Sequence, residues 1–216
     1  MLQISQKNRF FILLSLLFLF ITTLIYIVTQ KSSEERINNI LDKHIKTLET
    51  HYNIFLYNES RLAQQIYDET FSNKEVLKLL NEAYHNQHDP NRLNHIRQTL
   101  KEKLEKQYAI YKKNDLLQYH FIFPDNTVFL RMHKLDKFGD NLKSIREDFE
   151  YVNKTLKPIH GFTQGRTAHA FRNVYPIFAP DGTHIGAMEI SFPTEMLQRY
   201  LNDVSNIHSH FLVHKS

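Results

Sequence analysis

Cysteine is absent from this sequence of 216 residues, and glycine is scarce. The lack of cysteine excludes disulfide bonds, thiolate metal sites and cysteine nucleophiles. The five glycines all lie beyond residue 138, at positions 139, 161, 165, 182 and 186. This asymmetry predicts a helical first part and a turn-rich second part.

Several functional signatures are also missing. No block of Lys and Arg interleaves with aromatic residues, and the net charge is only +4, so we expect no nucleic-acid partner. No nucleophile elbow, phosphate-binding glycine loop or glycine-framed pair of carboxylates occurs, so we expect a protein without catalytic activity in these residues.

Histidine is abundant, with 13 residues, but its spacing does not predict a metal site. His208 and His210 would share one strand face, with His214 further along, while other histidines are scattered: His160, His169 and His184. No HExxH motif occurs, and a zinc site needs three or four convergent ligands. We therefore expect no metal and no other cofactor.

The strongest positive signal is an uncharged apolar run from Phe10 to Val28. At about 1.5 Å per residue, such a helix spans roughly the 30 Å of a membrane's hydrocarbon region. The exit from the run offers no small-residue cleavage site, so it predicts an uncleaved signal anchor over residues 10–30. Lys7 and Arg9 precede the run, which places residues 1–9 in the cytoplasm and the bulk of the chain in the periplasm, on an inner-membrane anchor.

Residues 31–113 read as a helical stalk followed by a helical segment. Apolar residues recur at three- and four-residue steps from Ser33 to about Thr70, at Ile37, Ile40, Leu41, Leu48, Tyr52, Phe55, Leu62 and Ile66. This stripe needs a partner, either the same segment of a second subunit or the domain that follows; we expect a homodimer through the stalk. A short helix capped by Ser72 or Asn73 and a longer one after Asp89-Pro90 complete the segment.

The apolar period changes from helix to strand at Asp115. Residues 114–204 predict an antiparallel sheet with flanking helices, hence an α+β fold. The expected elements are a strand over 117–123, a turn at Pro124-Asp125-Asn126, a strand over 127–133, a helix over 144–156, strands over 171–178 and 184–192 joined at Pro180-Asp181-Gly182-Thr183, and a helix after Pro193. Residues 205–216, with a possible strand over 207–213, read as the start of a second module.

Three stretches resemble the periplasmic Cache domains of bacterial signal transducers: residues 119–134, residues 137–142 and the paired strands over 172–190. These PAS-like modules bind ligands and precede histidine kinase, chemoreceptor or diguanylate cyclase outputs. The resemblance is greatest to the double-Cache type of two-component kinases. It implies a sensor domain that binds a small molecule and signals through the stalk.

The resemblance favours a ligand pocket at Arg131 and His133, which we expect opposite an aliphatic strand face of Val128, Leu130 and Met132. The alternative is a polar strand face in water. Arg172 either closes this pocket or pairs with Glu189 as a structural ion pair.

The candidates for the aromatic walls of the site are Tyr119, Phe121 and Tyr151. The alternative is that these residues belong to the ordinary hydrophobic core. Guanidinium groups bind carboxylates bidentately, so we expect a small anionic ligand. The competing interpretation is a membrane-tethered interaction module without a pocket.

Overall fold

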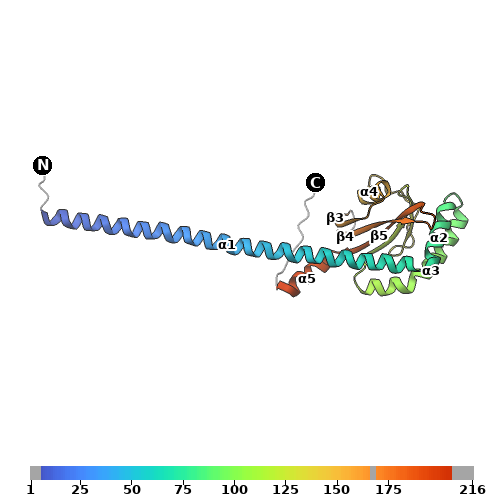
Figure 1. Cartoon of the computed structure of the whole chain (residues 1–216), viewed down its shortest axis with the longest axis horizontal. Helices are drawn as coiled ribbons and strands as arrows, with labels where there is room; N and C mark the ends of the chain where they lie inside the picture. Colours follow the sequence, from blue (N-terminus) through green and yellow to red (C-terminus); the bar gives the residue numbers. More distant parts are fainter. Residues whose placement is uncertain (1–5, 166–168, 206–216) are drawn as a thin grey trace. The chain divides into compact units, whose positions relative to one another are not determined.

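The computed structural model describes residues 6–165 and 169–205 (Figure 1). Its helices are α1 (Gln6–Ser72), α2 (Lys74–His85), α3 (Pro90–Lys113), α4 (Glu147–Thr155) and α5 (Glu195–Ser205). Its strands are β1 (Gln118–Ile122), β2 (Val128–Arg131), β3 (Ile159–Thr163), β4 (Ala170–Phe178) and β5 (His184–Pro193). The chain divides into two compact units, Met1–His51 and Tyr52–Ser216.

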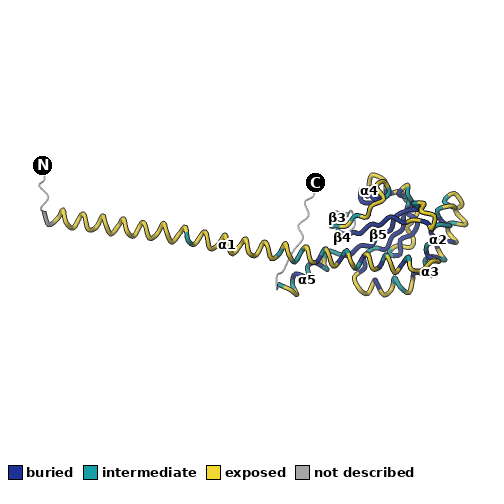
Figure 2. The backbone as a smooth tube through the Cα atoms, in the orientation of Figure 1, coloured by how far each residue is buried: buried dark blue, intermediate teal, exposed yellow. Residues whose placement is uncertain are grey.

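The first unit is helical wherever it is described, and its side chains are almost all exposed (Figure 2). Within the described residues, one helix is long and apolar enough to cross a membrane; its best 18-residue window has a mean hydropathy of 2.8 and no buried residue. The stalk residues Ile37, Ile40, Leu41 and Ile45 are also exposed in the single chain.

The second unit is built on a five-stranded antiparallel sheet with the strand order β2-β1-β5-β4-β3. The predicted α+β class is therefore confirmed. The central hairpin joins β4 to β5 through the expected turn, where Asp181 Oδ1 accepts the Thr183 N–H at 2.9 Å and Gly182 has φ +87°. A positive φ favours glycine, which explains that residue in the turn.

Helices α2 and α3 begin where the sequence places capping residues. Asn73 caps α2 by accepting the Glu75 N–H at 3.1 Å. Asp89 caps α3 by accepting the N–H groups of Asn91 and Arg92, with Pro90 in the first turn. Such caps satisfy backbone donors that have no partner within the helix.

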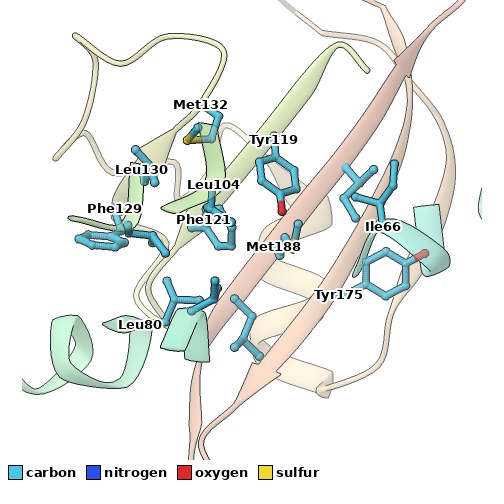
Figure 3. Packing of buried hydrophobic residues seen from close by; sticks show 14 of the residues in the cluster. Ile66, Leu80, Leu104, Tyr119, Phe121, Phe129, Leu130, Met132, Tyr175 and Met188 are labelled. Atoms are coloured by element: carbon cyan, nitrogen blue, oxygen red, sulfur yellow. The ribbon is translucent and has the colours of Figure 1, made fainter. Parts of the chain in front are cut away.

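One face of the sheet packs against the end of α1, α2 and α3, and this layer holds the main hydrophobic core (Figure 3). Ile66 of α1, Leu80 of α2 and Leu104 of α3 meet Tyr119 of β1 and Met188 of β5 there. The part of the stalk stripe from residue 55 to 66 therefore packs against the domain of the same chain, because Phe55 and Ile66 are buried.

The opposite face of the sheet carries α4 and a smaller cluster of buried apolar residues: Ile122, Val128, Leu142, Phe149, Val152, Val174 and Ala187. The backbones of β5 and β1 approach each other closely at Gly186 and Ile122. A Cβ built on Gly186 would lie 2.1 Å from the carbonyl oxygen of Ile122, so this position of β5 admits only glycine.

Three details differ from the sequence expectations. Strand β3 was missed, and α4 begins at Glu147 instead of residue 144. In β2, Leu130 pairs with Phe121 and Val128 pairs with Ile122, so Phe129 is an extra residue in a bulge. The prediction of one aliphatic face with Val128, Leu130 and Met132 was therefore wrong: the bulge moves Val128 to the α4 side, while Phe129 joins Leu130 and Met132 in the main core. The strand expected over 207–213 lies outside the described residues.

Candidate functional site

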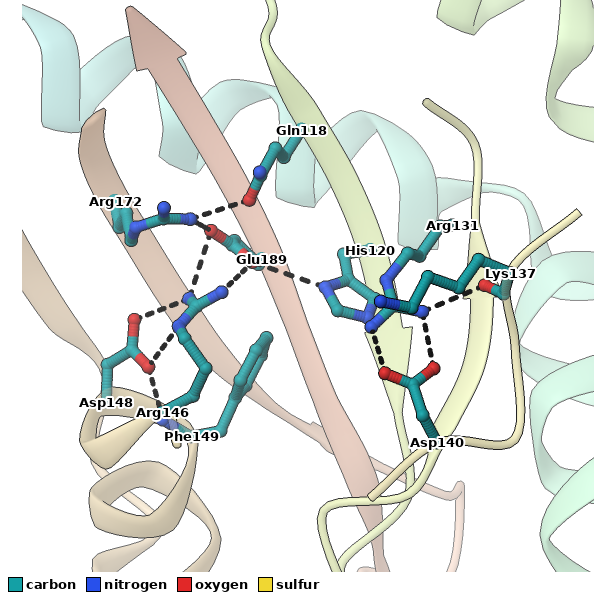
Figure 4. Close-up of polar contacts among 10 residues, drawn as sticks. All are labelled: Gln118, His120, Arg131, Lys137, Asp140, Arg146, Asp148, Phe149, Arg172 and Glu189. Atoms are coloured by element: carbon teal, nitrogen blue, oxygen red, sulfur yellow. Dashed lines mark hydrogen bonds and ion pairs between the residues drawn. The ribbon is translucent and has the colours of Figure 1, made fainter. Parts of the chain in front are cut away.

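Strand alternation brings the polar side chains of four strands to the α4-covered face of the sheet (Figure 4). His120 of β1 pairs across the sheet with Arg131 of β2 on one side and with Glu189 of β5 on the other. Arg172 of β4 lies on the same face and reaches Glu189 from the far side.

Glu189 is the centre of this polar network. Its side chain has no exposed surface, and the guanidinium groups of Arg172 and Arg146 both contact it, Arg146 at 3.1 Å. His120 Nδ1 lies 3.3 Å from the second carboxylate oxygen. Burial alone would raise the pKa of Glu189, but Arg146, His120 and Arg172 outweigh burial and hold it well below its usual range.

Arg146 connects the sheet to the start of α4. Besides Glu189, it holds Asp148 bidentately, with Nε and Nη2 donating to the two carboxylate oxygens at 2.9 and 2.6 Å. Its guanidinium carbon lies 4.5 Å from the centroid of the Phe149 ring, which fixes the plane of the group. Burial lowers the pKa of Arg146, but Glu189 and Asp148 together raise it above the ordinary value, so the group is a permanent cation.

Arg131 forms a separate, bidentate pair with Asp140 at 2.6 and 2.9 Å, and also donates to the carbonyl of Lys137 at 2.9 Å. The hydrogen bonds from Arg131 lower the pKa of Asp140. This pair fastens the loop after β2 to the strand.

The network is electrically balanced. It contains three guanidinium groups (Arg131, Arg146, Arg172) and three carboxylates (Asp140, Asp148, Glu189). Burial lowers the pKa of His120, and lowers that of His133 to about 4, so both rings are neutral at pH 7. The charges of these six paired groups therefore sum to zero at neutral pH.

The residues predicted for the ligand site divide into three groups. Arg131, Arg172 and Glu189 lie in the network, and Arg172 does pair with Glu189, one of its two predicted roles. His133 lies beside them, its ring centroid 6.0 Å from that of His120.

Tyr119 and Phe121 do not lie with these groups. They occupy the odd positions of β1 and point into the main core on the other face, where both are buried. Alternation along one strand cannot place them with His120.

Tyr151, the remaining predicted residue, lies on α4 and lines a surface pocket of about 610 Å³. Arg146 and Asp148 of the network also line it, and the other lining residues are Ser144, Ile145, Glu147, Ile159, Thr163 and Gln164. This pocket lies between the start of α4 and the edge strand β3. Its lining is mainly polar, with Ile145, Tyr151 and Ile159 as the apolar and aromatic part.

Arg146, Asp148 and His120 were missed by the sequence reasoning. For His120 a signal existed, because it alternates with Tyr119 and Phe121 and so must face away from them. Arg146 and Asp148 lie in a loop and a helix start, where no period shows which way a side chain points.

Among the side chains in the described ranges, no group of three or more His, Asp or Glu residues is placed to hold a metal ion.

Several known proteins are similar to this chain. A family described as the double sensory domain of two-component sensor kinase matches residues 57–216. The sensor domain of the V. cholerae histidine kinase DctB is 13% identical with a TM-score of 0.51, over 77% of this chain and 60% of that one. The E. coli DcuS sensor domain is 21% identical, with a TM-score of 0.39, over 44% of this chain and 69% of the other.

The ligand-binding domain of the Campylobacter jejuni chemoreceptor Tlp3, solved in complex with L-valine, is 16% identical with a TM-score of 0.40, over 71% of this chain and 66% of that one. A comparison with curated protein sequences gives no match. The likeness to DctB extends to the fold alone. Because the family match covers most of the chain, this protein belongs to the double sensory domain family of two-component sensor kinases, whose members are Cache sensor domains.

Proposed function

We propose that this chain is the ligand-sensing input region of a bacterial signal transducer, anchored in the inner membrane with its second unit in the periplasm. Family membership supports the sensor role. One helix able to cross a membrane, with Lys7 and Arg9 before its apolar run, supports the anchor and its direction. The proposal assigns no catalysis to these residues.

The proposed ligand site is the pocket lined by Tyr151, Arg146 and Asp148. Its volume of about 610 Å³ falls within the range of about 300–1,000 Å³ that small-molecule sites occupy. Ile145 and Ile159 supply apolar contact, and Thr163 and Gln164 of the β3 edge supply hydrogen-bonding groups.

The charge balance of the network bears on the class of ligand. An anion held by Arg131 and Arg172, as the sequence suggested, would compete with the carboxylates that already occupy those groups. A small ligand that carries both a carboxylate and an ammonium group adds no net charge. Its carboxylate would approach Arg146 and its ammonium group Asp148, so the pair would exchange partners without leaving a charge unbalanced. We therefore propose a zwitterionic ligand in preference to a purely anionic one.

The observation that carries the proposal is the double role of Arg146, which lines the pocket and contacts Glu189 at the centre of the sheet. A ligand that moves Arg146 also changes the environment of β5, whose other face packs in the same core as the end of α1. We propose that this displacement of the sheet against α1 is the signal.

A thermal-shift screen on the full chain in detergent micelles tests the proposal. The screen compares amino acids, dicarboxylates and simple amines, and we expect the amino acids to raise the unfolding midpoint. Tyr151→Ala should reduce that shift, since Tyr151 lies in the pocket wall and is 43% exposed, so the fold tolerates its removal. Tyr57→Ala, an exposed tyrosine outside this pocket, is the matched control and should keep the full shift. A shift by dicarboxylates alone contradicts the zwitterion, and a shift unaffected by Tyr151→Ala contradicts the site.

A further inference from the structure

A second carboxyl group, that of Glu59, is buried on the other side of the sheet from the Glu189 network. Glu59 lies in α1 and is 3% exposed. It belongs to the row of α1 side chains that turns toward the sheet: Phe55, Glu59, Ala63, Ile66 and Thr70. Steps of three and four residues place this row on one helix face, so the acid sits in the seam between α1 and the strands.

Two consecutive hydrogen bonds connect Glu59, through Asn173, to His160 at the surface. Asn173 of β4 donates its side-chain N–H to Glu59 Oε1 at 2.5 Å. The side-chain oxygen of Asn173 lies 2.9 Å from Nδ1 of His160 on β3, so the imidazole N–H donates to it. His160 itself is exposed. The two hydrogen bonds therefore join an exposed ring to a buried acid.

Glu59 and Glu189 are both buried but differ in their partners. Glu189 contacts two guanidinium groups. Within the described part of the chain, no ion pair joins Glu59 to a cation, and a neutral amide is its hydrogen-bond donor. A buried carboxylate without a counter-ion is much less stable than a paired one, and taking up a proton relieves it.

Protons have a route to this group. Glu59 lines a pocket of about 200 Å³ together with Leu56, Tyr57, Ser60, His160 and Gly161. Because the exposed His160 lines the same pocket, the carboxyl group can exchange protons with the solvent while the domain stays folded.

The charged and titratable surroundings of Glu59 come from several elements. His160 faces it from β3, and Tyr175 from β4, where burial and the charge of Glu59 raise the pKa of the phenol. From α5, Tyr200 lies against Phe55, one turn of α1 away. On α1 itself, Arg61 lies over the Tyr57 ring. Burial raises the pKa of Glu59 to about 7, although the hydrogen bond from Asn173 opposes this effect.

We propose that Glu59 makes the packing of α1 against the sheet dependent on external pH, so that the domain responds to protons near neutrality as well as to a ligand. In the protonated state a neutral side chain fills the seam and α1 packs tightly. In the ionised state an uncompensated charge is buried, and α1 separates from β3 and β4 more readily. Since α1 also includes the residues of the first unit, the contact acts on the helix through which the proposed function signals, but it needs no ligand in the pocket beside Arg146.

Hydrogen exchange of the full chain in lipid nanodiscs tests this inference, with rates corrected for the intrinsic effect of pH. The pKa of Glu59 is about 7 in the folded state, against 4.5 for the exposed group. The folded state therefore binds the proton more tightly, and its stability is highest at low pH and falls as the pH rises through 7. Protection of the α1 segment 52–70 should therefore fall about tenfold between pH 6 and pH 8 in the wild type. Glu59→Gln, which mimics the protonated acid, should abolish this dependence.

Asp68→Asn is the matched control, because Asp68 is an exposed acid on the same helix; it should behave as the wild type does. Equal pH dependence in the wild type and Glu59→Gln, or its loss in Asp68→Asn, overturns the proposal. Should Glu59→Gln fail to fold, carbon-13 NMR of the wild-type carboxyl groups decides the matter. One carboxyl that titrates above pH 6 is expected, and none above pH 6 overturns the proposal.

Discussion

Replacing Glu189 by Gln should be among the most damaging isosteric changes in this domain. The substitution keeps the shape of the side chain but removes the negative charge that faces Arg172 and Arg146. Both guanidinium groups would then lose this counter-charge, and neither is well solvated: the side chains of Arg172 and Arg146 are 3% and 15% exposed.

The expected loss follows from the geometry of the network. Breaking a buried ion pair by removing one partner typically costs about 3–5 kcal/mol. Arg146 keeps Asp148, which limits its own loss, whereas Arg172 keeps the neutral oxygen of Gln118 at 2.6 Å. We therefore expect about 3–4 kcal/mol, a large part of the 5–15 kcal/mol by which domains are usually stable.

Urea unfolding of the full chain in detergent micelles, followed by far-ultraviolet circular dichroism at pH 7, measures this loss. Glu102→Gln is the matched control, because Glu102 is an exposed acid on α3, and its change should stay within about 0.5 kcal/mol. A loss below about 1 kcal/mol for Glu189→Gln would refute the reasoning, since it would mean that Arg172 and Arg146 need no counter-ion.

The pH dependence gives a second check with a definite sign. The folded-state pKa of Glu189 is depressed, because its partners outweigh burial. Its contribution is therefore present above the unfolded value of 4.5 and is lost as pH falls below that value. The wild type should lose stability on acidification below about pH 4.5 more steeply than Glu189→Gln.

Three further outcomes are expected. Gly186→Ala should prevent folding or cost more than about 4 kcal/mol, because its Cβ would meet the Ile122 carbonyl oxygen at 2.1 Å; expression of soluble, cooperative material would contradict this. We expect the full chain to self-associate through the stalk, so the double change Ile40→Asp and Leu41→Asp should weaken self-association in sedimentation in detergent, since both side chains are exposed in the single chain; an unchanged mass would contradict association through the stalk. A phosphatase that folds only in the periplasm should be active when fused after Ser216. Activity of a cytoplasmic reporter at the same position would contradict the periplasmic location of the second unit.

Much of the fold follows from local patterns in the sequence. The helices over 74–85 and 90–113 show both a helical period and capping residues, and the hairpin over 170–193 has a turn that only a few residue types form. These elements were predicted within a few residues. Strand β3 was missed because it is a short edge strand that follows Pro158 and contains Gly161. Its apolar residues Ile159 and Phe162 are three positions apart, so the sequence shows no alternation there.

The candidate site was predicted less completely, for a reason that lies in the chain topology. Alternation assigns Glu189 and His120 to a sheet face, but nothing local shows which face α4 will cover. Arg146 is 43 residues from Glu189, in a segment without a repeating period. The bulge at Phe129 adds one residue to β2, which reverses the alternation that the sequence predicts for the residues on either side of it.

The position of Glu189 at the centre of β5 also bears on how the strands find their register. Its neighbours Met188 and Ile190 point into the core on the opposite face, so a slip of β5 by one residue would exchange them with the acid. The carboxylate would then lie among apolar helices with no guanidinium within reach, and two apolar side chains would face Arg172 and Arg146. Hydrophobic contacts alone tolerate many near-native alignments of a hairpin. A single buried charge in β5 makes the misaligned hairpins costly, so the ion pairs select one alignment of β4, β5 and β1 during folding.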